Sequence, residues 1–425
     1  MAAYKKKNIK KLQPSKERRS KIQMKQSNKA SKKTVVNQPR QTSFKVVTGG
    51  RSKRKNGVLA IALIVMGLII FNSVFTLIHP IGITEYFSAL YKSVGSGKGY
   101  PVTLGSEEII SVNKMDSAFY LLNQSDLQCY NINGKVISKV HHGLSKPVLS
   151  TSETRAIVYG QGEKILKIYN YDKEIASFQF EKELLSADIA DNGNYAVASY
   201  ADAYDSVVKV YNKKNEPLYE WYSASGIVSN IRLLENGKKL LVVTFDAENG
   251  VLKSKIQLLN FKSADAEYVY SFDNGLPYDI IPISNNKFYV IFEKSVELID
   301  IKHGLKPVNS SEYSNRIFIE SDGKILLAGS LSATVDNNKI CLIDKKGNVL
   351  CDINVDFAVN DVAFKNNFIF VLGNSEIIKL DRDGNILSST EVSFDTKKII
   401  PISERYVVAV SNNIEKIELK DGIDS

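Results

Sequence analysis

The chain has 425 residues, of which 56 are Lys or Arg and 46 are Asp or Glu, giving a formal net charge of +10. This charge is split: residues 1–57 carry a balance of +18 and the remainder −8, which disfavours a uniformly basic nucleic-acid-binding domain. Three Cys and four His exclude a disulfide scaffold and a multi-cysteine zinc protein, and leave little for His-based metal or triad chemistry. The apolar content of 44% excludes wholesale disorder.

The basic segment, residues 1–57, consists largely of Lys, Gln, Ser and Asn and is expected to be a disordered tail. Its simplest role is to determine membrane topology. A second role is contact with anionic lipid, at about 1 kcal/mol per basic residue near the surface. Nucleic acid binding is disfavoured, because the tail has no base-stacking pattern of aromatic residues.

Residues 58–79 are predicted to form a transmembrane helix. Residues 58–78 contain no charge, and a helix of that length spans about 32 Å, close to the hydrocarbon core of a bilayer. A buried helix of a soluble domain and a cleaved signal peptide are the alternatives. The apolar run is longer than a signal-peptide core and follows a 57-residue tail, which favours a retained signal anchor.

Flanking charges predict the orientation of this single span. Arg51, Lys53, Arg54 and Lys55 precede it, whereas a mixture of charges follows it. The positive-inside rule places the N-terminus in the cytoplasm and residues 80 onward on the outer, extracytoplasmic side of the cell membrane.

Residues 80–99 are predicted to be a stalk and hinge. Ile83, Phe87, Tyr91 and Val94 recur at helical spacing and form an apolar stripe with Leu90. The stripe is expected to pack under the following domain, the alternative being the membrane surface. The glycine-rich segment 95–99 is expected to be a flexible hinge.

From residue 100 the sequence consists of short β-branched and aromatic runs separated by turns. Polar turns open at an average interval of about 41 residues, which is the period of four-stranded propeller blades. The residues at which these turns open are Asn113, Ser152, Asp191, Glu235, Ser284, Ser321, Lys365 and Ser403. Residues 100–425 are therefore predicted to form an all-β, eight-bladed β-propeller. Seven blades is the alternative if one unit, near residues 226–276, is irregular.

The two ends of this domain are predicted to share a blade. The last unit, residues 397–420, supplies only three strands, and residues 100–104 provide a fourth. Pairing them closes the ring and removes its open edges.

The Asp-x-x-Gly turns, such as Asp381–Gly384, and the blade length resemble quinoprotein-like and WD-type propellers. With its basic tail and single anchor, the whole chain resembles a clostridial family of membrane-anchored propeller proteins of unknown function. The resemblance implies a propeller fold and brings no catalytic residues. Quinoproteins carry repeated tryptophan docking motifs, whereas this chain has only Trp221; no cofactor or metal is expected.

As the fourth strand of its blade, residues 100–104 would start on the face of the turns that join the first to the second and the third to the fourth strand. The segment before them is therefore expected to reach that face, and the opposite face is expected to point away from the membrane. Three long connections between second and third strands, residues 201–206, 246–253 and 330–338, are predicted to lie on this opposite face. They carry the candidate partner-binding residues: Asp202, Tyr204, Asp205, Asp246, Glu248 and Asp336. These could form an acidic, Tyr-bearing rim for a partner or a divalent cation; ordinary solvated loops are the alternative.

Cys341 and Cys351 flank the turn at Asp344–Gly347. A three-residue loop there would place them opposite each other on paired strands, which predicts a cross-strand disulfide. Two reduced thiols is the alternative.

The sequence favours a noncatalytic, membrane-tethered scaffold that binds a protein or cell-envelope partner through its distal loops. The alternative is a cell-envelope hydrolase that uses carboxylates in the central pocket of the propeller. A carboxylate cluster with a strongly shifted pKa would favour the hydrolase.

Overall fold

The computed structural model describes residues 54–95, 99–105, 107–115, 117–263, 265–273, 275–292, 295–309, 317–321, 323–330 and 338–420. The N-terminal tail up to residue 53 and the centre of the predicted hinge therefore lie outside the described residues. Helix α1 spans Arg54–Ile78, and its stretch Leu59–Ile78 is long and apolar enough to cross a membrane. Helix α2 spans Ile83–Ser93.

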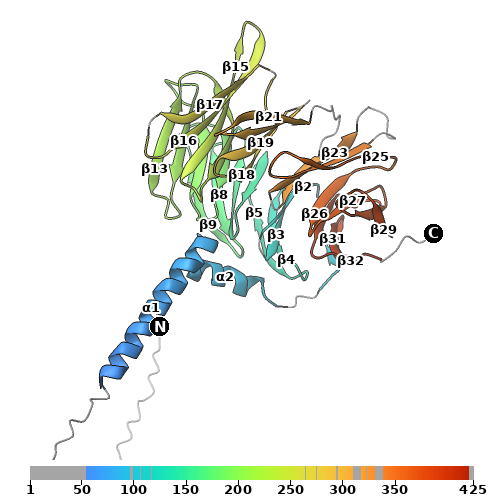
Figure 1. Ribbon diagram of the computed structural model, residues 1–425, viewed down its shortest axis with the longest axis horizontal. Coiled ribbons are helices and arrows are strands. Elements are labelled where there is room, and N and C mark those ends of the chain that lie inside the picture. The colour runs from blue at the N-terminus through green and yellow to red at the C-terminus, as the bar shows by residue number, and fades with distance from the viewer. Residues whose placement is uncertain are drawn as a thin grey trace, which may run out of the picture. The chain divides into compact units, whose positions relative to one another are not determined.

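The strands form eight four-stranded antiparallel sheets, arranged as the blades of a β-propeller (Figure 1). We call the strands of each blade A to D in the order of their pairing from the centre outward. Blades 1 to 4 comprise β2 (Ile109–Lys114), β3 (Ala118–Asn123), β4 (Asp126–Asn131) and β5 (Val136–His141); β6 (Pro147–Thr151), β7 (Arg155–Gly160), β8 (Ile165–Asn170) and β9 (Glu174–Gln179); β10 (Leu184–Ile189), β11 (Tyr195–Ser199), β12 (Ser206–Tyr211) and β13 (Pro217–Ser223); and β14 (Ile227–Leu234), β15 (Lys239–Glu248), β16 (Val251–Asn260) and β17 (Ala266–Phe272).

Blades 5 to 8 continue in chain order until the last, which combines the two ends of the domain. They comprise β18 (Asp279–Ser284), β19 (Lys287–Ile291), β20 (Val296–Asp300) and β21 (Gly304–Asn309); β22 (Ile317–Ser321), β23 (Lys324–Ser330), β24 (Asn338–Ile343) and β25 (Val349–Val355); β26 (Asp361–Lys365), β27 (Phe368–Leu372), β28 (Glu376–Leu380) and β29 (Ile386–Glu391); and β30 (Lys398–Pro401), β31 (Tyr406–Val410), β32 (Asn413–Glu418) and β1 (Val102–Thr103).

The predicted eight blades and the predicted closure are both confirmed. Strand β1 pairs with β32, with Val102 opposite Ile414 and Thr103 opposite Asn413. The N-terminal strand thereby becomes the outer D strand of blade 8, so the first and last parts of the domain share one sheet. This closure leaves no gap in the ring at which a blade face would remain uncovered.

The hydrophobic core lies between neighbouring blades. The B strands are buried along their whole length in several blades, for example β7 and β11, because each has another blade against both of its faces. Leu121 of blade 1 and Val408 of blade 8 belong to one cluster of buried side chains, so the core is continuous across the closure. This two-sided burial explains why the B strands read as unbroken apolar runs in the sequence.

The antiparallel order gives the propeller two different faces. The A–B and C–D turns open on one face, which we call the helix-bearing face, and the B–C and D–A connections open on the other, which we call the distal face. Helix α2 contacts the first of these faces in blades 1 and 2, for example through Asn131 and Arg155. The expectation that the segment before the propeller reaches the face of the A–B and C–D turns is confirmed.

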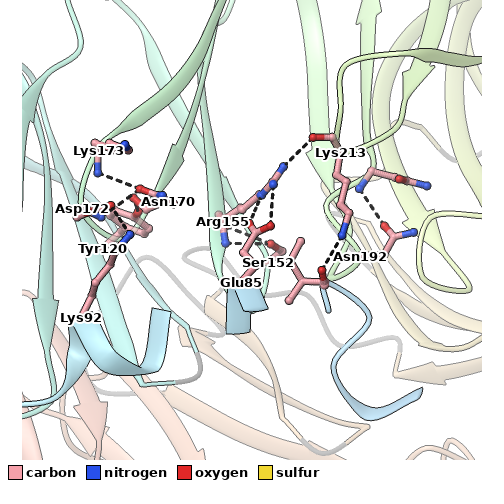
Figure 2. Close-up of polar contacts among 12 residues, drawn as sticks. Glu85, Lys92, Tyr120, Ser152, Arg155, Asn170, Asp172, Lys173, Asn192 and Lys213 are labelled. Atoms are coloured by element: carbon pink, nitrogen blue, oxygen red, sulfur yellow. Dashed lines mark hydrogen bonds and ion pairs between the residues drawn. The ribbon is translucent and has the colours of Figure 1, made fainter. Parts of the chain in front are cut away.

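Polar contacts hold helix α2 against the helix-bearing face (Figure 2). The Glu85 carboxylate accepts two hydrogen bonds from the Arg155 guanidinium, at 2.5 Å to Nε and 2.9 Å to Nη2. Lys92 Nζ lies 2.8 Å from Asp172 Oδ1. The stalk therefore does pack under the propeller, but Phe87, Tyr91 and Val94 of the predicted apolar stripe remain exposed.

The segment before α2 is fixed in the same way. Lys213 Nζ donates to the Ile81 carbonyl at 2.7 Å, and the Ile81 side chain is only 1% exposed. Ile81 packs against Gly193, where a Cβ would lie 2.8 Å from Ile81 Cδ1. Gly193 also has a φ of +81°, so both its backbone and the contact with Ile81 require glycine.

Candidate functional site

The predicted rim residues of blade 3 lie in the β11–β12 connection on the distal face. Asp202, Tyr204 and Asp205 are all exposed there. The Asp202 carboxylate contacts Lys182 Nζ, and the Tyr204 ring lies 4.9 Å from the ring of Tyr222, centroid to centroid. This part of the distal face therefore presents a pair of exposed tyrosines beside an ion pair.

Asp205 has a structural partner. Its Oδ2 accepts a hydrogen bond from Gly226 N at 2.7 Å, and its own backbone N donates to Ser223 O at 3.1 Å. Asp205 thus holds the β13–β14 connection, which leads from blade 3 to blade 4. It acts as a positioning residue for this surface rather than as a free carboxylate.

The predicted loop of blade 4, residues 246–253, is instead an extension of a β-hairpin. Asp246 pairs with Lys253, and Glu248 pairs with Val251, across a two-residue turn at Asn249-Gly250. Both turn residues have positive φ, as a type I′ hairpin requires, and Asn-Gly was the sequence signal that identifies it. The side chain of Glu248, and Asp336 as a whole, lie outside the described residues.

This hairpin projects beyond its own blade (Figure 1). Its strands β15 and β16 have ten residues each, but β14 pairs with β15 only as far as Phe245, and β17 pairs with β16 only from Ser254. The end of the hairpin is therefore paired only with itself. Val251 and Leu252 near its tip are 50% and 39% exposed.

A groove of about 410 Å³ runs along the seam between blades 2 and 3 and reaches the β11–β12 connection. Aromatic and charged side chains line it together, among them Phe178, Tyr200, Tyr222, Lys182 and Asp202. Of these residues, only Asp202 was identified from the sequence. The aromatics come from strands of two different blades, so no local pattern brings them together.

The second candidate site is the central channel, where a cavity of about 470 Å³ is lined largely by A strands. Its charged side chains connect neighbouring blades. Arg232 of blade 4 donates to Asp279 of blade 5 at 2.7 Å, and Asp188 of blade 3 accepts from the backbone N of Leu233 at 2.7 Å. The same arrangement recurs where Asp361 Oδ2 accepts from Ile399 N at 2.9 Å. These contacts indicate a structural role in joining blades.

Burial raises the pKa of the Asp188 carboxyl, while the nearby Arg232 guanidinium opposes that shift. Both carboxylate oxygens are already engaged: Oδ1 accepts from Ser150 Oγ at 2.9 Å and Oδ2 from Leu233 N. The two donors belong to blades 2 and 4, so these hydrogen bonds join both neighbouring blades to blade 3. Burial alone therefore accounts for the raised pKa of Asp188, and the contacts with neighbouring blades oppose it.

The predicted disulfide is wrong in this structure, in which Cys341 and Cys351 are free thiols. The turn was predicted correctly, because Ile343 pairs with Val349, but a bulge follows and shifts the register by one residue. Cys341 therefore pairs with Asp352, and Cys351 with Leu342. Since successive strand residues point to opposite faces, the two thiols lie in different core clusters.

Among the residues that the structure describes, no three His, Cys, Asp or Glu side chains are grouped so that they could hold a metal ion. Free Cys129 is buried, which raises its thiol pKa. The exposed tyrosines and the projecting hairpin described above both lie on the distal face. We define the blade 3–4 surface as Asp202, Tyr204, Tyr222, Val251 and Leu252.

The chain is similar to several solved structures, and the first of those named here supports the propeller fold. The C-terminal WD40 domain of Sif2 superposes with a TM-score of 0.52 at 11% identity, covering 77% of this chain and 99% of that domain. BamB from Moraxella catarrhalis gives a TM-score of 0.46 at 10% identity, with 75% and 99% of the two chains covered. Hydrazine synthase from Kuenenia stuttgartiensis gives 0.43 at 11% identity, with 76% and 99% covered.

No match was found among curated proteins. A family profile matches residues 90–419, which include the end of α2 and the propeller strands β1–β32. The chain therefore belongs to DUF5711, a family of unknown function.

Proposed function

We propose that this protein is a noncatalytic, membrane-tethered scaffold that binds a protein or cell-envelope partner through the blade 3–4 surface. The observation that carries the proposal is the β15–β16 hairpin, which projects past its blade with an exposed apolar tip at Val251 and Leu252. A projecting hairpin paired only with itself offers backbone groups at its edges and apolar side chains at its tip. Partner proteins use both features when they add a strand to an edge.

The exposed tyrosines support the same surface. Tyr204 and Tyr222 are 47% and 43% exposed and lie in ring contact. Tyrosine is enriched in recognition surfaces because it buries a large area while its hydroxyl still forms hydrogen bonds. The groove along the blade 2–3 seam opens beside these rings and adds Lys182 and Asp202 as a charged margin.

The proposed location is the cell membrane, with the N-terminus in the cytoplasm and the propeller outside. Helix α1 supports a span by length and composition, and the basic residues that precede it support this orientation. The tail of residues 1–57 would contact anionic lipid on the cytoplasmic side. In this arrangement the distal face is available to extracytoplasmic partners.

Site-specific photocrosslinking in intact cells tests the binding proposal. A photoreactive residue replaces Val251 or Tyr204 in the full-length protein, and Phe394 serves as the control. Phe394 is 83% exposed and lies in the β29–β30 connection, on the same face but in the opposite half of the ring. Adducts are expected at the first two positions and absent at Phe394. Equal adducts at all three positions, or none, would contradict the proposal.

Thiol labelling tests the orientation separately. The natural cysteines Cys129, Cys341 and Cys351 are all buried, so an introduced thiol dominates labelling. A membrane-impermeant reagent is expected to label Tyr204→Cys in intact cells and to label Ser20→Cys only after lysis. The reverse pattern would place the propeller in the cytoplasm.

The observation that favours the alternative function, a cell-envelope hydrolase in the central channel, is the raised pKa of Asp188, which lines the central cavity. Its carboxylate and that of Asp279 are both committed to contacts between blades. A hydrolase would lose its activity in Asp188→Asn while the fold persisted. The scaffold proposal expects the same variant to retain all photocrosslinked adducts.

A further inference from the structure

Helix α2 presents an apolar face that the propeller does not cover. The side chains of Phe87, Tyr91 and Val94 are 48%, 83% and 61% exposed. Phe87 and Tyr91 are four residues apart and so lie on one side of α2, and Val94 is the extended residue that caps its C-terminal end. An amphipathic helix of a globular protein normally buries its apolar side and exposes its polar side.

The opposite side of α2 is the one that docks. Ala89 and Ser93 are buried, and Glu85 and Lys92 make the ion pairs with Arg155 and Asp172 that Figure 2 shows. The propeller thus satisfies the polar side of the helix. Because the polar side of α2 is bound to the propeller, its apolar side faces away from the protein core. An exposed apolar surface of this kind indicates contact with an apolar environment outside the propeller.

The position of α2 in the chain identifies that environment. Only residues 79–82 separate the end of α1 from the start of α2. Even if fully extended, this link spans no more than about 18 Å. If α1 crosses a bilayer, the first turn of α2 must therefore lie close to the membrane surface.

The two helices also share one aromatic surface. The Phe87 ring stacks on Phe75 of α1, with centroids 5.6 Å apart and an interplanar angle of 18°. The Tyr86 ring packs edge-on against the same Phe75 at 5.5 Å. The exposed stripe of α2 therefore continues directly from the apolar surface of the end of α1. Aromatic residues, and tyrosine in particular, are enriched where a protein meets the lipid headgroups.

We propose that α2 is an interfacial membrane helix whose apolar stripe, formed by Phe87, Tyr91 and Val94, inserts into the headgroup region of the bilayer that α1 crosses. The inference rests on the proposed membrane span of α1. Helices of this kind lie in the plane of the interface and bury their apolar face in it. Here the polar face binds the propeller, so the propeller is fixed to the membrane surface rather than carried on a loose tether.

Fluorescence quenching by brominated lipids tests this placement. The full-length protein is reconstituted in phosphatidylcholine vesicles whose acyl chains are brominated either near the headgroup or near the chain end. Single tryptophans are introduced as Tyr91→Trp, as Leu68→Trp in the middle of α1, and as Phe394→Trp on the distal face. Tyr91 and Phe394 have the same exposed fraction, 83%, so they form a matched pair.

The natural Trp221 lies in β13 of the propeller. The emission of each variant is therefore measured twice, once in a Trp221→Phe background and once with Trp221 retained. In the second series Trp221 adds a constant, unquenched part to the emission. The second series keeps the test valid if Trp221→Phe weakens the fold. Thermal unfolding of each variant verifies that the propeller is intact.

Emission of Tyr91→Trp is expected to fall at least about twofold with bromine near the headgroup, while Phe394→Trp stays unchanged. Leu68→Trp is expected to be quenched best by bromine near the chain end. Quenching at Leu68 without quenching at Tyr91 would overturn the interfacial helix and leave the anchor in place. No quenching at Leu68 would overturn the membrane span itself. Equal quenching at Tyr91 and Phe394 would indicate general adsorption and would also overturn the inference.

Discussion

The helix-bearing face and the distal face are built from opposite ends of the same strands, yet they differ in regularity. In the described part of the chain, the connections on the helix-bearing face contain two to five residues, whereas those on the distal face contain up to six and include the projecting hairpin. Blades 1 and 2 meet α2 on the first face through defined contacts, such as Arg155 with Glu85. The distal connections, by contrast, carry the exposed side chains. A rigid ring can therefore keep one face constant for attachment and vary the other for recognition.

Removing the Arg155 side chain should have the largest effect. Arg155→Ala leaves Glu85 without its bidentate partner at a site where the Arg155 side chain is only 10% exposed. Breaking a largely buried ion pair from one side costs about 3 kcal/mol in the free energy of unfolding. In Arg155→Ala, amide hydrogen exchange should become faster in α2 than in the natural protein, while the strand ends near the distal face should change less.

The control for Arg155 is the pair Lys164 and Glu183, whose side chains are 42% and 43% exposed. Lys164→Ala should change the free energy of unfolding by less than about 1 kcal/mol, because exposed ion pairs contribute little. If both variants lose the same stability, the attachment of α2 does not depend on the buried pair.

Substitutions at two glycines with positive φ, one on each face, allow a direct comparison of the two faces. Gly193, with φ +81°, lies against Ile81 on the helix-bearing face, whereas Gly162, with φ +75°, lies in the β7–β8 connection with nothing within 4 Å of an added Cβ. Gly162→Ala should cost only the backbone strain, about 1 kcal/mol. Gly193→Ala adds a collision with Ile81 and should cost about 2 kcal/mol or more. Chemical denaturation measures the free energy of unfolding of both variants. Equal losses would show that the Ile81 side chain can move aside without an energetic penalty.

The acid dependence of stability should also differ between the faces. Lys287 and His303 bind the Asp300 carboxylate at the C–D turn of blade 5, each at 2.9 Å, and its pKa is lowered mainly by the Lys287 hydrogen bond. A lowered folded-state pKa stabilises the protein above the unfolded value of about 4, and this contribution is lost as the pH falls further. Asp300→Asn should therefore lower the free energy of unfolding at pH 7, by an amount that shrinks below about pH 4.

Asp202→Asn on the distal face is the control for this pH series, because the Asp202 side chain is 81% exposed. Its unfolding profile should match that of the natural protein across the range. A pH-independent effect of Asp300→Asn would mean that packing, rather than charge, accounts for its contribution.

The smallest effect on stability is expected at the hairpin tip. Changing Val251 and Leu252 together to Ser should alter the free energy of unfolding by no more than about 0.5 kcal/mol, because both are exposed. The same change should abolish crosslinking from Tyr204. The matched control is the double change of Ile386 and Leu387 to Ser, neighbouring residues of β29 that are 45% and 36% exposed. Loss of adducts in both doubles would point to a general effect of surface hydrophobicity.

The fold was predictable because its signals are local and repeated. The polar turns that open at Ser284, Ser321 and Lys365 mark the last residues of the A strands β18, β22 and β26. The remaining predicted turns lie within two residues of the ends of their A strands. A period repeated over eight units averages out errors in any one of them, which explains why the blade number was correct although the spacing near residues 226–276 is stretched.

The candidate site was only partly predictable. Asp202 and Tyr204 were found because an unusually long connection is visible in the sequence. The spacing of the units predicts a long connection over residues 246–253, whereas Asn249-Gly250 signals the tight hairpin that the structure has. The aromatic groove between blades 2 and 3 could not be found, because Phe178 and Tyr222 meet only when two blades pack.

By itself, the sequence determined the apolar helix, the all-β domain, the eight repeats and the closure through residues 102–103. Each of these depends on a pattern within a few dozen residues, or on the count of such patterns. Only the tertiary structure decided that α2 docks through Glu85 and Lys92, and that a single bulge keeps Cys341 from Cys351. Helical periodicity reveals that a helix has two faces, but the surface that receives it decides which face is buried. Likewise, one extra residue in a strand reverses the direction of every side chain beyond it.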